Sequence, residues 1–391
     1  MTCIIFGDAF TFPDGDASTN RVYTYARGLL EHGAGVHVVC FRNSYESEYS
    51  GESEGIRYYH PYNRRIRSRS FILRRMHSAG KYMRTFILFR KLYRINKDAF
   101  ILCYTKSLST QLFAFLLSRF FGFLLVLERS EHPYKDYKSR AAVKAKGAIK
   151  VALEIRFTDL IFCISDYLME FYGARGAGKE KLYKVPSTVD TERFAGSFAR
   201  PMERKYICYC GSLTIVKDGV DILIKSYAEL ADRFRHVDLA LVGKADTAAD
   251  EEFFMNLVSS RGLNERVHFT GKLPRNEIPA YLCNAEILTL ARPRSIVADA
   301  GFPSKVTEYL ATGRPVVATA VGEIPEYLSD GENAFIAEPG NVTSFASKMK
   351  YVLDNYDEAI KAGRKGRDLA FSVFNYNIQA KRIIQLIGSL S

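Results

Sequence analysis

Short apolar segments typical of β-strands alternate with amphipathic helical patterns from one end of the chain to the other, and this rhythm restricts the fold strongly. In the first half the predicted strands are 3–6, 36–41, 101–104, 124–127 and 160–164. In the second half they are 206–210, 239–242, 267–269, 287–290, 315–319 and 334–336. Helices are predicted at 20–31, 220–232, 251–260, 304–312 and 343–354. Several strands are almost wholly apolar, so we expect parallel sheets covered by helices on both faces.

The rhythm is interrupted between residues 185 and 205, where Pro186, Pro201 and mixed charges occur. The predicted fold class is therefore α/β, with two Rossmann-like, doubly wound parallel-sheet domains. The length of 391 residues suits two such domains. Ligands bind outside the carboxyl ends of strands in such sheets, so we expect the active site in a central cleft that both domains face.

Charge composition favours an acidic partner. Lysine and arginine number 55 against 43 acidic residues, for a formal net charge of +12. The partner could be a phosphate-bearing ligand, an anionic membrane or a nucleic acid. The hydrophobic fraction of 47% and charged fraction of 25% are those of a folded globular chain and argue against intrinsic disorder.

The cysteines and the apolar segments predict a reduced, cytoplasmic protein. Seven cysteines occur, and Cys208 and Cys210 share one face of a predicted strand without a second pair at zinc spacing. The N-terminus reaches Asp8 without a basic region, which is unlike a signal peptide. The apolar stretch 99–127 contains Lys106 and Arg119, so no membrane-spanning helix is predicted.

The most informative stretch is residues 298–326, which read ADAGFPSKVTEYLATGRPVVATAVGEIPE. A turn leads into a helix with Ser304 as the expected N-cap and Gly313 at its end. Such a helix start, with Lys305 beside it, favours a phosphate. The carboxylate of Glu308 suits paired sugar hydroxyls, although it could instead only complement the helix dipole.

This stretch resembles the donor-binding domain of family 4 glycosyltransferases, the retaining group with the GT-B fold found in bacterial polysaccharide and glycolipid biosynthesis. Further segments resemble the family's motifs in the same order. They are FPDGDASTNR at 12–21 followed by Leu29 and Gly33, FTDLIFCIS at 157–165, VPSTVD at 185–190 followed by Phe194, YCG at 209–211 followed by Lys217, LVG at 241–243 and VHFTG at 267–271. The resemblance covers nearly the whole chain.

The resemblance implies an acceptor-binding domain at residues 1–190 and a nucleotide-sugar domain at 191–370, with a C-terminal helix at about 371–391 packing back on the first domain. It also implies roles for single residues. Lys217 would neutralise the donor diphosphate, Gly211 and Ser212 would approach it, and Glu308 would bind the ribose. Lys272 would lie beside the base. The remaining implied contacts are Gly301, Phe302, Pro303, Ser304 and Lys305 for phosphate and sugar, and Gly15, Asp16 and Asn20 for the acceptor.

Two positions depart from the family pattern. The first glutamate of the family's glutamate pair would stand at Ala300, and Asp299 is one residue away. The basic residue that usually follows Gly211 is Ser212. Lys305 could replace the missing positive charge, and Asp299 could partly replace the acid. These departures motivate the alternative of a family member that binds nucleotide without transferring a sugar.

His132 and Glu131 follow a predicted strand where the family places acceptor contacts. His132 could polarise the donor sugar or the acceptor hydroxyl, with Glu131 orienting it, or it could be a structural loop histidine. The family's retaining reaction needs no protein nucleophile, and none is predicted. Asp14 and Asp16 superficially resemble a metal-binding DxD motif, but they lie in the first loop, so turn chemistry is the better interpretation and no metal cofactor is predicted.

A basic segment at residues 64–97 contains twelve lysines and arginines and no acid. At helical spacing Tyr82, Phe86, Phe89 and Tyr93 share one face, which predicts a helix resting in an anionic headgroup layer. The alternatives are a solvated face with ordinary core packing, or nucleic-acid binding, which the absence of a recognition motif disfavours.

Two functions follow from these observations. The first is a retaining transferase that moves a sugar from a UDP- or GDP-sugar co-substrate to a lipid-linked or glycan acceptor, at the cytoplasmic face of the inner membrane. The second is a degenerate family member that binds nucleotide or lipid phosphate without transfer.

Overall fold

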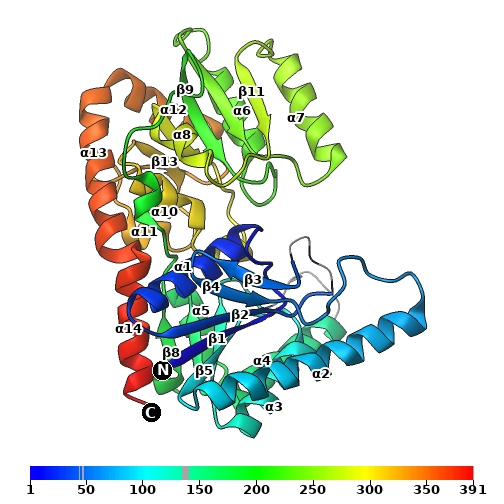
Figure 1. The fold of residues 1–391 in the computed structure, drawn as a ribbon. Helices are drawn as coiled ribbons and strands as arrows, with labels where there is room; N and C mark the ends of the chain where they lie inside the picture. The colour runs from blue at the N-terminus through cyan, green and yellow to red at the C-terminus, as the bar shows by residue number, and fades with distance from the viewer. Residues whose placement is uncertain (44, 46–47, 134–140, 391) are drawn as a thin grey trace. The chain divides into compact units, whose positions relative to one another are not determined.

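A computed structural model describes residues 1–43, 45, 48–133 and 141–390 of the chain. These residues form two compact units (Figure 1). Unit 1 comprises Met1–Thr188 and Tyr376–Ser391, and unit 2 comprises Val189–Asn375. The chain therefore changes unit near residues 188 and 375, compared with the expected boundaries at 190 and 370.

Unit 1 is built on a sheet with the strand order β3-β4-β2-β1-β5-β6-β7-β8, parallel at every pair except β3–β4. Its strands are β1 (Thr2–Gly7), β2 (Gly35–Cys40), β3 (Ser50–Ser53), β4 (Ile56–Tyr59), β5 (Ala99–Cys103), β6 (Leu124–Arg129), β7 (Leu160–Cys163) and β8 (Leu182–Lys184). Its helices are α1 (Ala17–Glu31), α2 (Phe71–Ile95), α3 (Leu108–Phe121), α4 (Ala141–Phe157), α5 (Asp166–Gly173), η1 (Lys179–Lys181) and α14 (Tyr376–Gly388).

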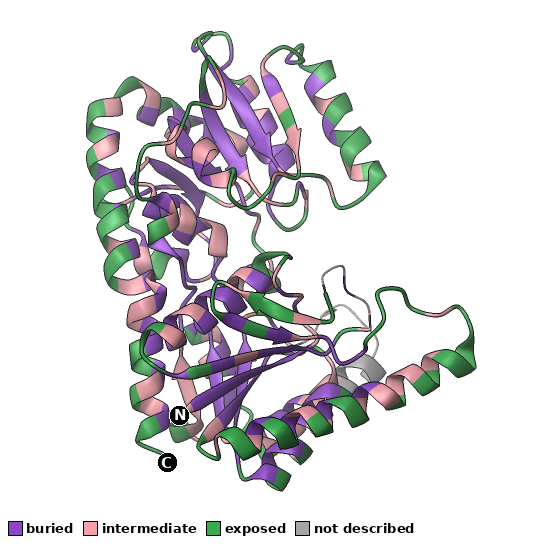
Figure 2. Ribbon diagram, viewed as in Figure 1, coloured by how far each residue is buried: buried purple, intermediate pink, exposed green. Residues whose placement is uncertain are grey.

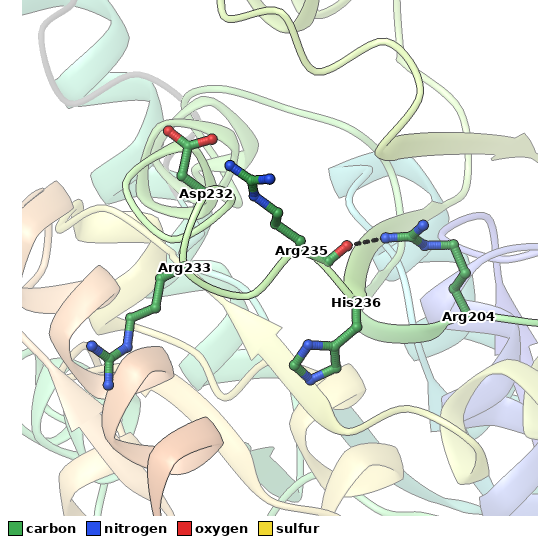
Figure 3. A pocket seen from close by; sticks show the side chains of 5 residues that line it. All are labelled: Arg204, Asp232, Arg233, Arg235 and His236. Atoms are coloured by element: carbon green, nitrogen blue, oxygen red, sulfur yellow. Dashed lines mark hydrogen bonds between the residues drawn. The ribbon is translucent and has the colours of Figure 1, made fainter.

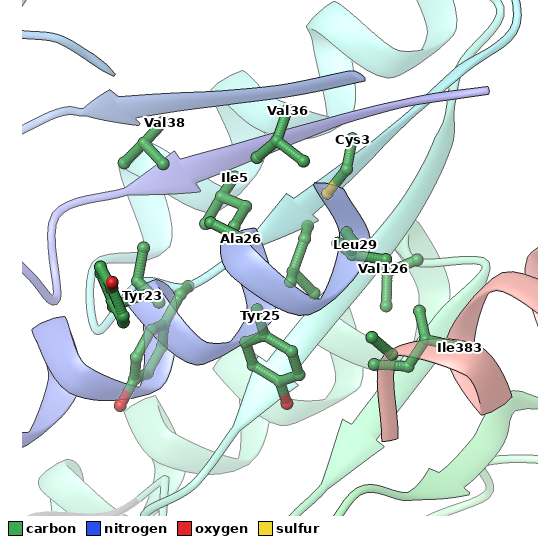
Figure 4. Packing of buried hydrophobic residues seen from close by; sticks show 14 of the residues in the cluster. Cys3, Ile5, Tyr23, Tyr25, Ala26, Leu29, Val36, Val38, Val126 and Ile383 are labelled. Atoms are coloured by element: carbon green, nitrogen blue, oxygen red, sulfur yellow. The ribbon is translucent and has the colours of Figure 1, made fainter. Parts of the chain in front are cut away.

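Helices cover both faces of this sheet, as its apolar strands require. Cys3 and Ile5 of β1 lie in a buried cluster with α1 and with Ile383 of α14 (Figure 4). Phe6 points to the opposite face, where its ring lies 5.9 Å from that of Phe89 in α2. Successive residues of a strand point to opposite faces, so β1 contributes to both cores.

A buried ion pair fixes α1 against the sheet. Arg21 of α1 donates from Nε to Glu128 of β6 at 2.7 Å, and both side chains are buried. Its remaining nitrogens donate to the carbonyls of Val185 and Pro186 at 2.9 and 2.8 Å. The guanidinium therefore connects the first helix with the last residues of the unit before the chain passes to unit 2.

Unit 2, all of whose residues are described, contains a parallel sheet with the order β11-β10-β9-β12-β13-β14. Its strands are β9 (Lys205–Cys210), β10 (Val237–Val242), β11 (Val267–Gly271), β12 (Ile287–Leu290), β13 (Val316–Thr319) and β14 (Phe335–Ala337). Its helices are η2 (Thr191–Phe194), α6 (Val220–Ala228), α7 (Ala248–Ser260), α8 (Ile278–Cys283), α9 (Ile296–Asp299), α10 (Ser304–Ala311), α11 (Ile324–Tyr327), α12 (Val342–Asp354), α13 (Tyr356–Leu369) and η3 (Ala370–Phe374).

The aromatic face of α2 packs inside unit 1, which contradicts the expectation that this face rests in a headgroup layer. Tyr82 and Phe86 lie with their ring centroids 4.7 Å from Phe113 and 5.5 Å from Phe121 of α3. Phe89 is completely buried. The alternative of ordinary core packing is therefore correct for this face, because α3 offers a matching aromatic surface that the sequence could not place beside α2.

Three strands have no counterpart among the predicted ones. β3 consists of Ser, Gly, Glu and Ser at the sheet edge and has no apolar side chain to bury. β4 and β8 are only four and three residues long. β3 and β8 are the two edges of the sheet, and β4, next to β3, has only four residues, so periodicity over such short segments does not find these strands.

Candidate functional site

Two glycines bring the loops after β9 and β10 together at the carboxyl edge of the unit 2 sheet. Gly211 donates from its backbone nitrogen to the carbonyl of Val242 at 2.9 Å. A Cβ atom on Gly243 would lie 1.9 Å from the Gly211 carbonyl oxygen, so no larger residue fits there. Gly211 itself has a φ of 149°, which side chains rarely adopt. Both glycines are therefore needed for the close approach of these loops.

A buried lysine lies directly against this turn. The Nζ of Lys305, in the first turn of α10, lies 3.0 Å from a carboxylate oxygen of Asp218 and donates to the hydroxyl of Tyr209 at 2.8 Å. A Cβ on Gly211 would lie 2.5 Å from the same Nζ atom. Lys305 thus reaches the end of β9, and its charge has an acidic partner in Asp218.

Arg292 is a further cation at this edge, and it belongs to none of the motifs described above. It is buried, and its Nε donates to the carbonyl oxygen of Lys217 at 2.9 Å. The side chain of Lys217 is exposed. The signal that could have identified Arg292 is its place two residues after the buried strand β12, because parallel strands end at one edge of the sheet.

The pKa values of Asp218 and Lys305 are shifted by the neighbouring positive charges and by burial. Burial disfavours the ionised form of Asp218, but Lys305, Arg292 and Lys217 together hold its pKa below the usual value. Burial lowers the pKa of Lys305, Asp218 opposes this effect, and Arg292 adds to it. Three cations therefore lie close enough to this one carboxylate to favour its charged form.

Glu308 also lies near the end of β9, and it is paired. Its Oε1 accepts a hydrogen bond from Arg193 of η2 at 2.9 Å. Burial raises the pKa of the Cys210 thiol to about 12; Glu308 raises it further, whereas Lys305 and Arg193 lower it. Among the described residues nothing donates to Oε2 of Glu308, so this oxygen remains available for a hydroxyl.

The start of α10 differs slightly from the expectation. Its N-cap is Pro303, which makes no side-chain cap, and Ser304 is the first helical residue. The reason is that proline holds φ at −70° in an extended backbone, which suits the position just before a helix. Gly313, with a φ of 74°, lies just beyond the C-cap Thr312, as expected.

The other expected donor contacts have different surroundings. Gly301, Phe302 and Pro303 are buried, and the Phe302 ring packs 5.1 Å from that of Phe374, so this side chain serves packing. Ser212 is exposed beside Gly211. Lys272 is exposed after β11, and two strand spacings of about 5 Å separate β11 from β9.

In unit 1, His132 and Glu131 have different described neighbours. Glu131 lies 2.7 Å from Nζ of Lys106. The His132 ring is buried, 4.9 Å from the Phe171 ring of α5. No hydrogen bond between these two side chains is among the described contacts, and Glu131 pairs with Lys106, so the orienting role of Glu131 stays a prediction. The carboxylate of Glu131 forms an ion pair with Lys106, which follows β5.

The expected acceptor residues lie in the loop before α1. Asp16 caps α1, accepting a hydrogen bond from the Ser18 backbone nitrogen at 3.0 Å. A Cβ on Gly15 would lie 2.0 Å from Oγ1 of Thr19, so glycine is needed there. Asn20 is half-buried in the first turn. In the described part of the chain, no group of three or more histidine, cysteine, aspartate or glutamate residues is arranged to hold a metal ion.

A surface hollow of about 520 Å³ lies on unit 2, lined by Arg204, Asp232, Arg233, Arg235 and His236 (Figure 3). Arg204 donates to the Arg235 carbonyl oxygen. These residues immediately precede β9 and β10, so the hollow is at the amino edge of the sheet, opposite the edge where ligands of such sheets bind.

The whole chain has the fold of known glycosyltransferase structures. It aligns with sucrose-phosphate synthase from Thermosynechococcus elongatus at a TM-score of 0.75 and 17% identity, covering 100% of this chain and 99% of that one. It aligns with Anabaena HepE in complex with UDP-glucose at a TM-score of 0.68 and 17% identity, covering 100% of both chains. The fold is therefore GT-B, as the resemblance implied.

Residues 204–355 match the family described as glycosyl transferases group 1. Unit 2 thus contains a group 1 glycosyltransferase domain, and the recognition of a family 4-type glycosyltransferase is confirmed. The cations Lys217, Arg292 and Lys305 all lie within this domain.

Curated relatives share part of the chain. The GDP-mannose-dependent alpha-(1-6)-phosphatidylinositol monomannoside mannosyltransferase of Mycolicibacterium smegmatis is 27% identical over 240 residues, 59% of this chain and 62% of that protein. The 2-deoxystreptamine glucosyltransferase of Streptomyces kanamyceticus is 28% identical over 253 residues, 62% of this chain and 60% of that protein. The chain thus matches about three fifths of the length of these relatives.

Proposed function

We propose that this protein is a retaining glycosyltransferase that transfers a sugar from a nucleotide-diphosphate sugar to a membrane-associated or glycan acceptor in cell-surface polysaccharide or glycolipid biosynthesis. The observation that carries the proposal is the group of Lys217, Arg292 and Lys305 around Asp218, at the ligand edge of a group 1 glycosyltransferase domain. A departing nucleoside diphosphate gains negative charge in the transition state, and fixed cations stabilise that charge.

Each residue of the cluster then has a role. Lys217 reaches the diphosphate from the exposed side of the loop. Arg292 supplies the charge that Ser212 lacks, because the charge of Lys305 is largely balanced by Asp218. Lys305 and the backbone near Gly211 contact the diphosphate on the side of the sheet. With these cations in place, the transfer requires no metal ion.

Glu308 binds the nucleotide ribose through Oε2, while Arg193 holds Oε1 and fixes the orientation of the carboxylate. A carboxylate accepts hydrogen bonds from two hydroxyls without offering a donor, which suits a ribose diol. Lys272 lies beside the base, and the backbone of residues 301–304 contacts the phosphates and the transferred sugar. His132 and the loop holding Gly15, Asp16 and Asn20 serve the acceptor side.

The donor is a UDP- or GDP-sugar. Support comes from the names of similar proteins: one relative is GDP-mannose-dependent, and one structure of similar fold holds UDP-glucose. A relative that acts on phosphatidylinositol monomannoside supports a lipid-linked acceptor, and we place the reaction at the cytoplasmic face of the membrane. No described helix is long and apolar enough to cross a bilayer.

The experiment measures thermal stabilisation by UDP, GDP and ADP, followed by hydrolysis and transfer from the sugar form of the nucleotide that stabilises most. Lys217→Ala, Arg292→Gln and Glu308→Ala should each lower turnover at least about tenfold, the loss of one charged contact. Lys361→Ala, an exposed lysine of α13, is the matched control and should keep full turnover. Wild-type turnover in the Lys217 and Arg292 variants would refute the assignment of the diphosphate site.

The same experiment decides on the second candidate, a binding module without transferase activity. Its motivation is Ala300, which is buried where the family's first glutamate would stand. Asp299 is half-buried and has no hydrogen-bonding partner for its carboxylate among the described residues. Stabilisation by a nucleotide without hydrolysis or transfer from any donor would favour the binding module.

A further inference from the structure

The outer face of α2 carries an exposed apolar stripe, distinct from the aromatic face that packs inside unit 1. Ile72, Met76, Met83 and Ile87 are 70%, 63%, 63% and 58% exposed. Their spacing places them on one side of the helix, one above the other. The buried residues of the helix, Lys81, Thr85, Phe89 and Leu92, belong to the opposite side. We call the four exposed residues the α2 stripe.

The stripe is bordered by positive charge. At helical spacing Arg90 and Arg94 continue it toward the C-terminal end of α2, and Arg75 and Lys91 flank it, all four exposed. None of these four forms an ion pair with an acidic residue in the described structure. The surrounding sequence from His60 to Lys97 contains no acid at all. The whole surface is therefore positive, with an apolar centre.

The N-terminal turns of α2 are the most exposed part of this helix. No residue from Phe71 to Gly80 is buried, although Lys81 and three residues beyond it are. In Figure 2 this part of the helix is mostly exposed along its length. Phe71 and Leu73 are themselves 62% and 46% exposed. Several large apolar side chains exposed next to each other on one surface are typical of an interaction site.

We propose that the α2 stripe docks on the surface of an anionic lipid bilayer, with Ile72, Met76, Met83 and Ile87 entering the boundary of headgroups and acyl chains. A helix with one apolar face and arginines beside it lies in this plane. Arginines at the border meet lipid phosphates, and their long stems let them do so while the apolar side chains are inserted.

The charge pattern favours this occupant over others. A second copy of this chain would bring two positive surfaces together, which repel each other. A nucleic acid would be met by basic residues, whereas the centre of this surface is apolar. The proposal deepens the proposed function, because it names the surface by which a transferase with a lipid-linked acceptor would reach its membrane, but the docking itself does not require transfer.

The experiment is flotation of the full chain with vesicles of phosphatidylglycerol and phosphatidylcholine in equal parts, and with vesicles of phosphatidylcholine alone. Wild-type protein should float with the anionic vesicles at low salt, and molar salt should release most of it. Neutral vesicles should carry little protein.

Two double variants test the two halves of the surface. Met83→Gln with Ile87→Gln removes apolar contacts and keeps the charge, and Arg90→Gln with Arg94→Gln removes charge and keeps the stripe. Each should lower the ratio of bound to free protein about tenfold or more. The matched controls are Met255→Gln on α7 and Lys361→Gln with Arg364→Gln on α13, all exposed in unit 2, and both should bind as wild type.

Equal flotation of the α2 variants and the controls would overturn the proposal, as would an absence of flotation of wild-type protein at low salt. Dimerisation that depends on Met83 and Ile87, without vesicle binding, would assign the stripe to a second copy. Binding to RNA in place of vesicles would assign it to a nucleic acid.

Thermal stabilisation of the wild-type protein by UDP and GDP is measured in the same samples. Flotation without stabilisation by either nucleotide would refute the proposed function and leave the docking surface standing. Stabilisation by a nucleotide without flotation would refute the docking surface and leave the proposed function standing.

Discussion

At the scale of single residues, Lys81 is the clearest case of a basic residue that serves the interior. It belongs to the basic segment but is buried, and its Nζ donates to Asn43 at 2.8 Å and to the Phe41 carbonyl at 3.1 Å. The same atom lies 3.8 Å from the centre of the Phe41 ring. No carboxylate accepts a hydrogen bond from it in the described structure. Burial lowers the pKa of Lys81 to about 8, with Asp8 opposing the effect and Arg67 adding to it.

The lowered pKa of Lys81 predicts a specific dependence of stability on pH. Below about 8 the lysine is charged in both states, and burying that charge costs stability. Between 8 and the unfolded value of 10.5 only the unfolded state holds the proton, so the cost disappears as the pH rises. Lys81→Met should therefore be more stable relative to wild type at pH 7 than at pH 10, by on the order of 1–3 kcal/mol.

Urea unfolding of both proteins across this pH range measures the difference. Lys91→Met, on the exposed side of the same helix, controls for the removal of a lysine. A difference between Lys81→Met and wild type that stays constant from pH 7 to pH 10, or grows, would contradict the prediction.

Residue types and spacing were enough to identify some of the candidate site but not its partners. Lys217, Lys305 and Glu308 were recognised from their motifs, and the structure places the last two near the Cys210 thiol. Asp218 and Arg193, which pair with Lys305 and Glu308, come from distant parts of the chain. Pairing across such separations depends on how the strands are ordered, which local patterns do not contain.

At the scale of elements, the close contact of α1 with α14 depends on a glycine in the middle of a helix. A Cβ atom on Gly28 would lie 2.6 Å from the Cβ of Ala380 and 2.9 Å from the Tyr376 carbonyl oxygen. The hydroxyl of Tyr376 also donates to Glu31 at 2.6 Å. Glycine weakens a helix interior, so its use here reflects the close packing that it allows.

Gly28→Val should therefore destabilise the protein by about 1–3 kcal/mol, because the side chain forces the two helices apart. The midpoint of thermal unfolding, followed by circular dichroism, measures the loss. Gly388→Val, at the end of α14 where nothing lies within reach of a Cβ, is the control and should change the midpoint little. Similar midpoints for the two variants would show that the contact has no energetic weight.

Most elements could be predicted from the sequence, whereas the neighbours of their faces could not. The apolar runs predicted the central strands of both sheets, because those strands are buried on both sides and are apolar throughout. The aromatic face of α2 was expected to rest in a headgroup layer and is instead packed against α3, because that helix has two apolar faces and its sequence does not say which one is inside. Only the position of α3, with Phe113 and Phe121, decides which face is inside.

At the scale of the whole molecule, the chain returns to unit 1 after completing unit 2. α14 contributes Ala380, Ile383 and Ile387 to the buried cluster of unit 1, next to residues from the first strand and helix. The residues of α14 are therefore part of the core of unit 1, although the whole of unit 2 lies between them and the first part of unit 1 in the sequence.

Deleting residues 376–391 should loosen unit 1 and leave unit 2 intact, because the deletion exposes the apolar side chains that α14 covers. Hydrogen exchange should show at least about tenfold faster exchange in β1 and β2, and unchanged exchange in β9 and β10. Deleting only residues 389–391 is the control, since Ser389 and Leu390 are exposed. Equal acceleration in both units would contradict the division of the chain.

The sequence by itself determined the class of fold and pointed to a candidate donor site, because apolar periodicity, glycine turns and the motif around Lys305 and Glu308 are local properties. Tertiary structure alone decided that Arg292 joins Lys217 and Lys305 around Asp218, and that Ile72, Met76, Met83 and Ile87 remain outside. The physical reason is that burial and charge pairing depend on which distant surfaces meet. The order of the strands and the packing of α3 on α2 determine which surfaces are in contact, and no single segment of the chain contains that information.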